Sequence, residues 1–119
     1  MNGLVVNLTH SIDDVDRTSV AMVVAGASVA SAQQTTVFLS SEGTRLAAKG
    51  VADELHEEGF APMHELVSAY VEAGGTFLVC SPCAKKRGIG EEDLIEGASI
   101  VGGASLVKLL VDGATSLSF

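Results

Sequence analysis

The only two thiols of this chain, Cys80 and Cys83, stand in a single Cys-Ser-Pro-Cys run. A thiol becomes nucleophilic at neutral pH when a helix start or nearby positive charge favours the thiolate. Cys80 ends an expected strand and Pro82 suits the first position of a helix, which places Cys83 in the first helical turn. Basic residues follow directly: Lys85, Lys86 and Arg87. The segment predicts a nucleophilic or sulfur-carrying cysteine, and a buried cysteine that merely ends a strand is the alternative.

The Cys-x-x-Cys spacing is compatible with three kinds of chemistry. A thioredoxin-type redox pair can form a reversible disulfide, but here the motif follows the third expected strand and no aromatic residue precedes Cys80. A zinc site needs four ligands, and no second cysteine pair or spaced histidine pair exists beside His10, His56 and His64. Persulfide chemistry uses one nucleophilic cysteine and a second that can resolve it. No metal or cofactor is therefore predicted.

Other polar residues have a functional and a plainer interpretation. His10 follows the first expected strand and could face Cys80 as a base, or be a hydrogen-bonded loop histidine. Gly102-Gly103 could hold an anion at a helix start. That segment lacks the lysine of a phosphate-binding loop, which favours close packing of strand and helix instead.

The elements that position these candidate site residues are strands and helices that alternate along the chain. The expected strands are Gly3–Thr9, Thr35–Ser40, Thr76–Cys80, Ala98–Val101 and Ala114–Phe119. Three helices are expected. The first runs from a cap at Ser11 or Asp13 to about Ala32, the second follows Pro62, and the third covers Ala104–Val111. This alternation predicts an α/β fold: a three-layer α/β/α sandwich with a mostly parallel five-stranded sheet, in one domain over residues 1–119.

Ligands and reactive groups gather beyond the carboxyl ends of the strands in open α/β sheets. Four segments therefore deserve examination: Asn7–Asp14, Ser40–Thr44, Cys80–Gly88 and Gly102–Ser105. The first helix is apolar nearly all round over Ser19–Ala32, which predicts that it is central or covered by a partner chain. An oligomeric binding or scaffold subunit without chemistry of its own is thus an alternative function.

Composition and charge exclude several classes of protein. The 119 residues include 7 Lys+Arg against 15 Asp+Glu, a net charge of -8, which argues against a nucleic-acid binder. An apolar fraction of 47% argues against disorder. The N-terminal segment lacks the basic start of a signal peptide, and Ser19–Ala32 is too short to span a bilayer. We expect a cytoplasmic protein without a membrane span.

The run Thr76–Ile89 resembles the cysteine segment of the DsrE/DsrF-like family. In that family a strand-end cysteine is followed eight positions later by the glycine of an Arg-Gly pair, as Cys80 is followed by Gly88. The early strand leading to Asp13, Asp14 and Arg17, the Thr35–Gly43 segment and the Glu92–Gly103 segment are also similar to the family. The resemblance spans nearly the whole chain.

The resemblance implies a DsrE-like parallel five-stranded α/β/α fold and a homo-oligomer, often a trimer or hexamer. Sulfur-relay members carry sulfur as a persulfide on the strand-end cysteine and pass it between donor and acceptor proteins. By position that cysteine is Cys80, with Lys85, Lys86, Arg87 and His10 nearby. Cys83 departs from the relay members, where another residue usually stands, and leaves a redox role open. The resemblance thus implies a sulfur carrier or sulfurtransferase-like protein.

Overall fold

Five short strands form one sheet in the computed structural model, which describes residues 3–119. They are β1 (Leu4–Leu8), β2 (Thr35–Leu39), β3 (Thr76–Cys80), β4 (Ala98–Val101) and β5 (Thr115–Ser118). The spatial order is β4-β3-β2-β1-β5, and each neighbouring pair runs parallel. The predicted α/β fold with a mostly parallel five-stranded sheet is confirmed.

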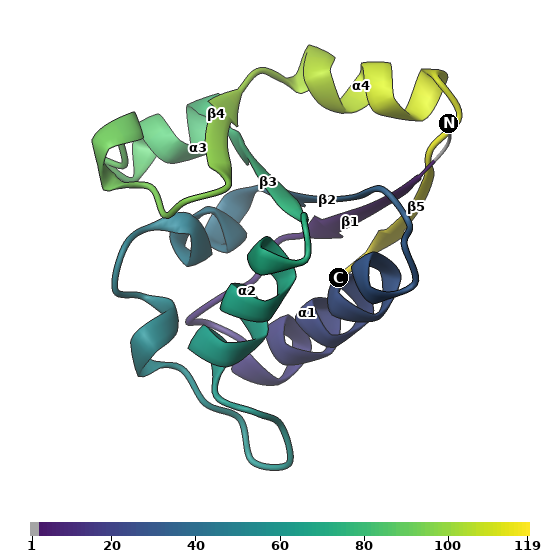
Figure 1. The fold of residues 1–119 in the computed structure, drawn as a ribbon. Coiled ribbons are helices and arrows are strands. Elements are labelled where there is room, and N and C mark those ends of the chain that lie inside the picture. The colour runs from purple at the N-terminus through teal and green to yellow at the C-terminus, as the bar shows by residue number, and fades with distance from the viewer. Residues whose placement is uncertain (1–2) are drawn as a thin grey trace.

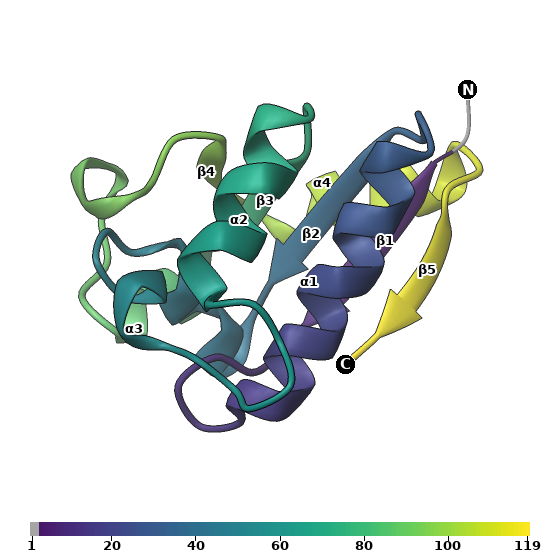
Figure 2. The same cartoon turned by 60° about the horizontal axis from the view of Figure 1, so that its bottom comes forward.

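Helices cover both faces of this sheet. They are α1 (Val15–Ala30), α2 (Met63–Glu72), α3 (Ser81–Lys86) and α4 (Gly103–Val111), with short 3-10 turns η1 (Ser41–Ala47), η2 (Ala52–Glu54) and η3 (Glu91–Asp93). Helices α1 and α2 lie side by side on one face, while α4 crosses the opposite face (Figure 1; Figure 2). This arrangement is the predicted three-layer sandwich. Within residues 3–119 no helix is long and apolar enough to cross a membrane.

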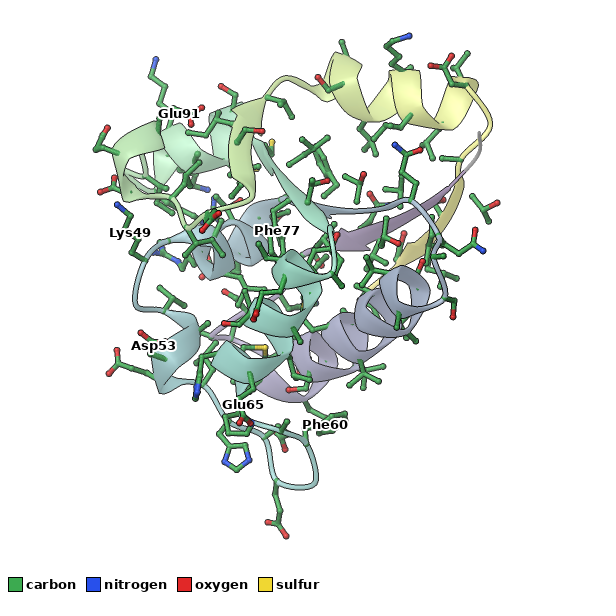
Figure 3. The ribbon with its side chains drawn as sticks, viewed as in Figure 1. Lys49, Asp53, Phe60, Glu65, Phe77 and Glu91 are labelled. Carbon is green, nitrogen blue, oxygen red and sulfur yellow. The ribbon has the colours of Figure 1, made fainter. Side chains whose placement is uncertain are left out.

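The main core lies between the sheet and the α1–α2 layer. Successive side chains of a strand point to opposite faces, and every second residue of the central strands enters this core: Val6, Leu8, Val37, Leu39, Phe77 and Val79. The fully buried Tyr70 packs edge-on against Phe77, with ring centroids 5.1 Å apart. Figure 3 shows Phe77 near the centre of the molecule, with the charged residues Lys49, Asp53, Glu65 and Glu91 toward its outside. The same alternation directs Leu78 and Cys80 to the face that α4 crosses.

The start of α1 differs from the sequence prediction. Ser11 and Asp13 are the expected caps, but the cap is Asp14, whose side chain accepts from the Arg17 backbone N–H at 3.0 Å. Both expected residues have other partners: Ser11 bonds to the η1 loop, and Asp13 bonds to His10. Ser11, Asp13 and Asp14 can all cap a helix by residue type. Because Ser11 and Asp13 form hydrogen bonds with other residues, Asp14 is the one that caps α1.

Candidate functional site

The two cysteines lie where β3 passes directly into α3. Cys80 is both the last residue of β3 and the cap of the helix, and Cys83 is the third helical residue. The predicted position of Cys83 in the first turn is confirmed. Ser81 is the first helical residue, so Pro82 occupies the second helical position and not the predicted first. Both thiols are free and partly exposed, as reactive groups at this edge must be.

The Cys83 sulfur has a hydrogen-bond donor from the neighbouring strand. Strand β2 pairs with β3 in parallel, with Leu39 opposite Val79, so both chains leave the sheet side by side. The backbone N–H of Ser41 donates to Cys83 Sγ over 3.3 Å. Ser41 has a φ of 51°, a left-handed conformation that a residue with a side chain rarely adopts. Strained backbone of this kind clusters at functional sites, where the surrounding structure holds it in place.

Contacts on both sides hold the Ser41 loop. Ser11 Oγ donates to the Glu42 carbonyl oxygen over 2.6 Å, and the Gly43 backbone N–H donates to the Ser40 carbonyl over 2.9 Å. Gly43 is buried against the end of β1, where an added Cβ would collide with the Leu8 carbonyl oxygen. The absence of a side chain at Gly43 therefore lets the loop approach β1 closely enough to present the Ser41 amide.

A carboxylate between two guanidinium groups fixes Arg87 beside the thiols. Glu42 accepts from Arg45 Nε and from Arg87 Nε, each over 2.9 Å. These hydrogen bonds, first that of Arg87 and then that of Arg45, lower the pKa of Glu42. The Arg87 side chain, only 12% exposed, also donates from a terminal nitrogen to the Cys83 carbonyl over 3.2 Å. One negative and two positive charges leave this cluster with a net positive charge.

The two thiols differ in acidity. Burial raises the pKa of Cys80, and its hydrogen bond to Cys83 raises it further. Burial also acts to raise the pKa of Cys83, but the Ser41 amide, the Cys80 thiol and the charges of Arg87 and Lys86 together lower it. Cys83 is therefore the thiol that ionises first.

The predicted site residues are only partly brought together. Arg87 lies in the site, and Lys86 acts on Cys83 through its charge. Lys85 is exposed on α3. The hydrogen bond of the His10 ring is with Asp13 Oδ2 at 2.7 Å, as expected for a loop histidine. The roles assigned to Lys85 and His10 beside the thiols stay predictions.

Ser41 and Glu42 are the site residues that the sequence did not single out. They lie within Ser40–Thr44, one of the four strand ends that the sequence identifies, so the segment was predictable but the residues were not. The Ser41 contribution comes from a backbone amide, which every non-proline residue carries, and Glu42 is one of 15 acidic residues. Residue type alone therefore does not identify Ser41 or Glu42 as part of the site.

The described residues hold no cluster of metal ligands, and one surface hollow is lined by residues other than the two cysteines. Within residues 3–119 no three His, Cys, Asp or Glu side chains are arranged to hold a metal ion. A hollow of about 370 Å³ is lined by α2 and by loop residues such as Lys49, Asp53 and Glu96, and neither cysteine lines it.

We expect iodoacetamide to alkylate Cys83 faster than Cys80 at neutral pH. Only the thiolate reacts, and the pKa is lowered for Cys83 and raised for Cys80. The Cys83 rate should rise at pH values below the ordinary thiol pKa of about 8.5, and the Cys80 rate only above it. Short labelling pulses of the unaltered protein across a pH series, with peptide mass spectrometry, measure both rates. Equal profiles for the two cysteines would contradict the assignment.

Comparison with protein families gives a match over essentially the whole chain. The family model described as the DsrE/DsrF-like family matches residues 3–119. Among curated proteins, MJ0989 of Methanocaldococcus jannaschii is 32% identical over 83 residues, 70% of this chain and 69% of that protein. MJ0760 of the same organism is 35% identical over 75 residues, which are 63% of this chain but only 27% of that longer protein. Both carry the name of uncharacterized proteins.

Solved structures share the fold. The ychN protein from E. coli superimposes with a TM-score of 0.82 at 19% sequence identity, over 100% of both chains. MTH1491 from Methanobacterium thermoautotrophicum, titled a protein of unknown function, has a TM-score of 0.69 at 18% identity, over 99% of this chain and 100% of that one. At these identities the likeness establishes the architecture.

Proposed function

The chain belongs to the DsrE/DsrF-like family, and from this premise we propose that it carries sulfur as a persulfide on the Cys80–Cys83 pair. The observation that supports the proposal most strongly is the Cys83 sulfur, which accepts the Ser41 amide and lies beside Arg87. Both features favour a thiolate, the form that attacks sulfur. In this proposal Cys83 makes the first attack, and Cys80, the position that the family resemblance assigns to the carried sulfur, is the second thiol.

The loading step is a thiol–persulfide exchange. The Cys83 thiolate attacks the outer sulfur of a donor persulfide, R–S–SH, and the donor thiolate leaves: Cys83–S⁻ + R–S–SH → Cys83–S–SH + R–S⁻. One S–S bond breaks and another forms, so the step needs no oxidant, metal or cofactor. The net positive charge of Arg87 and its surroundings compensates the charge of the attacking thiolate.

Sulfur loading is tested with glutathione persulfide as the donor. We expect the peptide that contains both cysteines to gain one sulfur atom, as measured by mass spectrometry after the donor is removed. The matched control replaces both thiols, Cys80→Ser with Cys83→Ser, and should gain none while keeping its circular dichroism spectrum. The proposal fails if neither the unaltered protein nor Cys80→Ser gains sulfur, or if the double variant gains as much.

Donor and acceptor proteins would approach the same edge of the sheet. Lys85 and Lys86 are exposed on α3 in a chain whose net charge is -8, so they offer a locally basic surface to an acidic partner. The two free thiols suit a reducing compartment, and we place the carrier in the cytoplasm.

We also propose that the chain assembles as a homo-oligomer, a trimer or hexamer, through the surface of α4 and β5. Helix α4 has no buried residue, and Val107 is 58% and Val111 77% exposed. Leu117 on the edge strand β5 is 44% exposed. The sequence pointed instead to the apolar helix α1. Its residues Ala21, Met22 and Ala25 are buried in the core, and its exposed valines, Val20 at 38% and Val23 at 44%, are less exposed than Val107 and Val111 of α4. A contiguous exposed apolar surface such as that of α4 and β5 usually indicates a protein interface.

Paired charge substitutions test which helix forms the interface. We expect light scattering to give the mass of an oligomer for the unaltered protein, a lower mass for Val111→Asp, and no change for Val23→Asp. A buried, unpaired carboxylate is costly in an interface and harmless on a free surface. A monomeric unaltered protein, or a loss of assembly only with Val23→Asp, would contradict this assignment. An assembled protein that never accepts sulfur would instead favour the alternative of a scaffold subunit without chemistry.

A further inference from the structure

We propose that the Cys80–Cys83 pair can release its sulfur as hydrogen sulfide, because Cys80 attacks the Cys83 persulfide and the two cysteines close into a disulfide. This inference rests on the proposed function, since it begins with a persulfide on Cys83. It adds a product and an end state that a carrier with a single cysteine cannot reach. The two cysteines of this chain are arranged for it.

The geometry of the pair places the attacking sulfur beside its target. Cys80 caps α3 and Cys83 is its third residue, so the two are one helical turn apart. Residues with this spacing lie next to one another, and each cysteine is among the groups that shift the pKa of the other. A Cys-x-x-Cys at a helix start closes a disulfide in thiol oxidoreductases. Cys80 and Cys83 of this chain have the same spacing at the start of α3.

The step balances without an outside oxidant: Cys80–SH + Cys83–S–SH → Cys80–S–S–Cys83 + H₂S. The Cys80 sulfur attacks the Cys83 sulfur, and the bond between Cys83 and the outer sulfur breaks. Its electron pair leaves with the outer sulfur, which takes the proton that Cys80 loses. The sulfane sulfur is thereby reduced to sulfide, and the two cysteine sulfurs are oxidised to the disulfide.

The surroundings hold the inner sulfur in place for this attack. The Ser41 amide contacts Cys83 Sγ from the β2 side, and Arg87 bonds to the carbonyl of the same residue. Both contacts are made to atoms that remain after loading, so the added sulfur does not remove them. An acceptor protein that takes the outer sulfur and the neighbouring Cys80 thiol then compete for the same persulfide. The acceptor passes sulfur on intact, whereas Cys80 converts it to sulfide.

The test follows sulfide and protein mass after a single loading. The protein is loaded with glutathione persulfide, freed of donor and incubated without any acceptor. We expect the unaltered protein to release one sulfide for each persulfide, measured with methylene blue. Its intact mass should fall to that of the disulfide, two hydrogens below the reduced protein. Cys80→Ser should load but release no sulfide over the same time, and Cys80→Ala guards against a folding defect of the serine variant.

The outcomes separate this inference from the proposed function. If the unaltered protein loads and then keeps its sulfur, the inference is overturned while sulfur carriage stands. Sulfide release from Cys80→Ser and Cys80→Ala at the rate of the unaltered protein also overturns it. If no variant loads at all, the proposed function itself has failed. Diamide oxidation gives an independent check: a protein that cannot form the Cys80–Cys83 disulfide cannot take this route, however well it loads.

Discussion

Cys83→Ser is expected to slow sulfur loading several-fold at neutral pH, because it removes the thiol whose pKa is lowered and leaves only the thiol whose pKa is raised. The substitution removes the thiol whose pKa the Ser41 amide, the Cys80 hydrogen bond and Arg87 lower against the opposing effect of burial. Cys80 remains, but burial keeps its pKa raised. Loss of its hydrogen bond to Cys83 relieves part of that rise, so residual loading on Cys80 is expected to be slow rather than absent.

Three variants of one short segment make this result specific. Ser81→Ala removes an exposed hydroxyl between the cysteines and should load at the rate of the unaltered protein. Cys80→Ser should retain most of the loading rate, since Cys83 keeps its bonds to Ser41 and its place beside Arg87. The rates follow from the mass of the cysteine peptide at successive times. Fast loading of Cys83→Ser together with slow loading of Cys80→Ser would reverse the roles of the two thiols.

The sequence predicted the position of the site better than its chemistry. Cys80 ends a strand and Pro82 cannot continue it, so the place of the thiols at the sheet edge followed from local patterns. The difference in acidity depends on Ser41, 42 positions before Cys83 along the chain. That contact exists only because β2 and β3 are neighbours and because Ser41 adopts a left-handed φ. Neither the strand order nor a single strained dihedral can be derived from residue types.

The fold was predictable because its strands and helices have strong local signals. The strands over Thr76–Cys80 and Ala98–Val101 have the expected bounds. The other three strands and the helices α1, α2 and α4 differ from the expected bounds by at most three residues at their ends. Glycine pairs and polar turns separate short apolar segments, and this alternation of turns and apolar segments predicts βαβ units well. The strand order and the cap of α1 were not predictable. They depend on contacts between segments that lie far apart in the sequence.

The thiol site is positively charged, although the chain as a whole carries a negative net charge. A net charge of -8 makes the protein acidic, yet Arg45 and Arg87 share the single carboxylate of Glu42 beside the thiols. The pairing orients Arg87 and leaves one positive charge in excess. A free arginine there would be more mobile, and a fully neutralised one would not favour the thiolate. Glu42 is therefore best understood as the residue that fixes Arg87 without cancelling the positive charge of the cluster.

Phe77→Ala is expected to lower the free energy of unfolding by about 3–5 kcal/mol, the usual cost of removing a buried phenylalanine ring. The ring is fully buried between the sheet and α2 and packs edge-on against Tyr70 (Figure 3). Tyr70 in turn donates its hydroxyl to the Thr76 carbonyl over 2.7 Å, so the two rings tie α2 to the start of β3. Urea denaturation followed by circular dichroism measures the change.

Phe60→Ala is the matched control, because it removes the same ring from the loop before α2, where the side chain is only partly buried (Figure 3). Its cost should be about 1 kcal/mol, as for a residue outside the core. Phe77 and Cys80 point to opposite faces of β3, so the Cys83 alkylation profile should be unchanged in Phe77→Ala wherever the protein remains folded. Equal losses of stability from the two variants would show that the core is not centred on Phe77. A shifted alkylation profile would show that the core and the thiol site are coupled through β3.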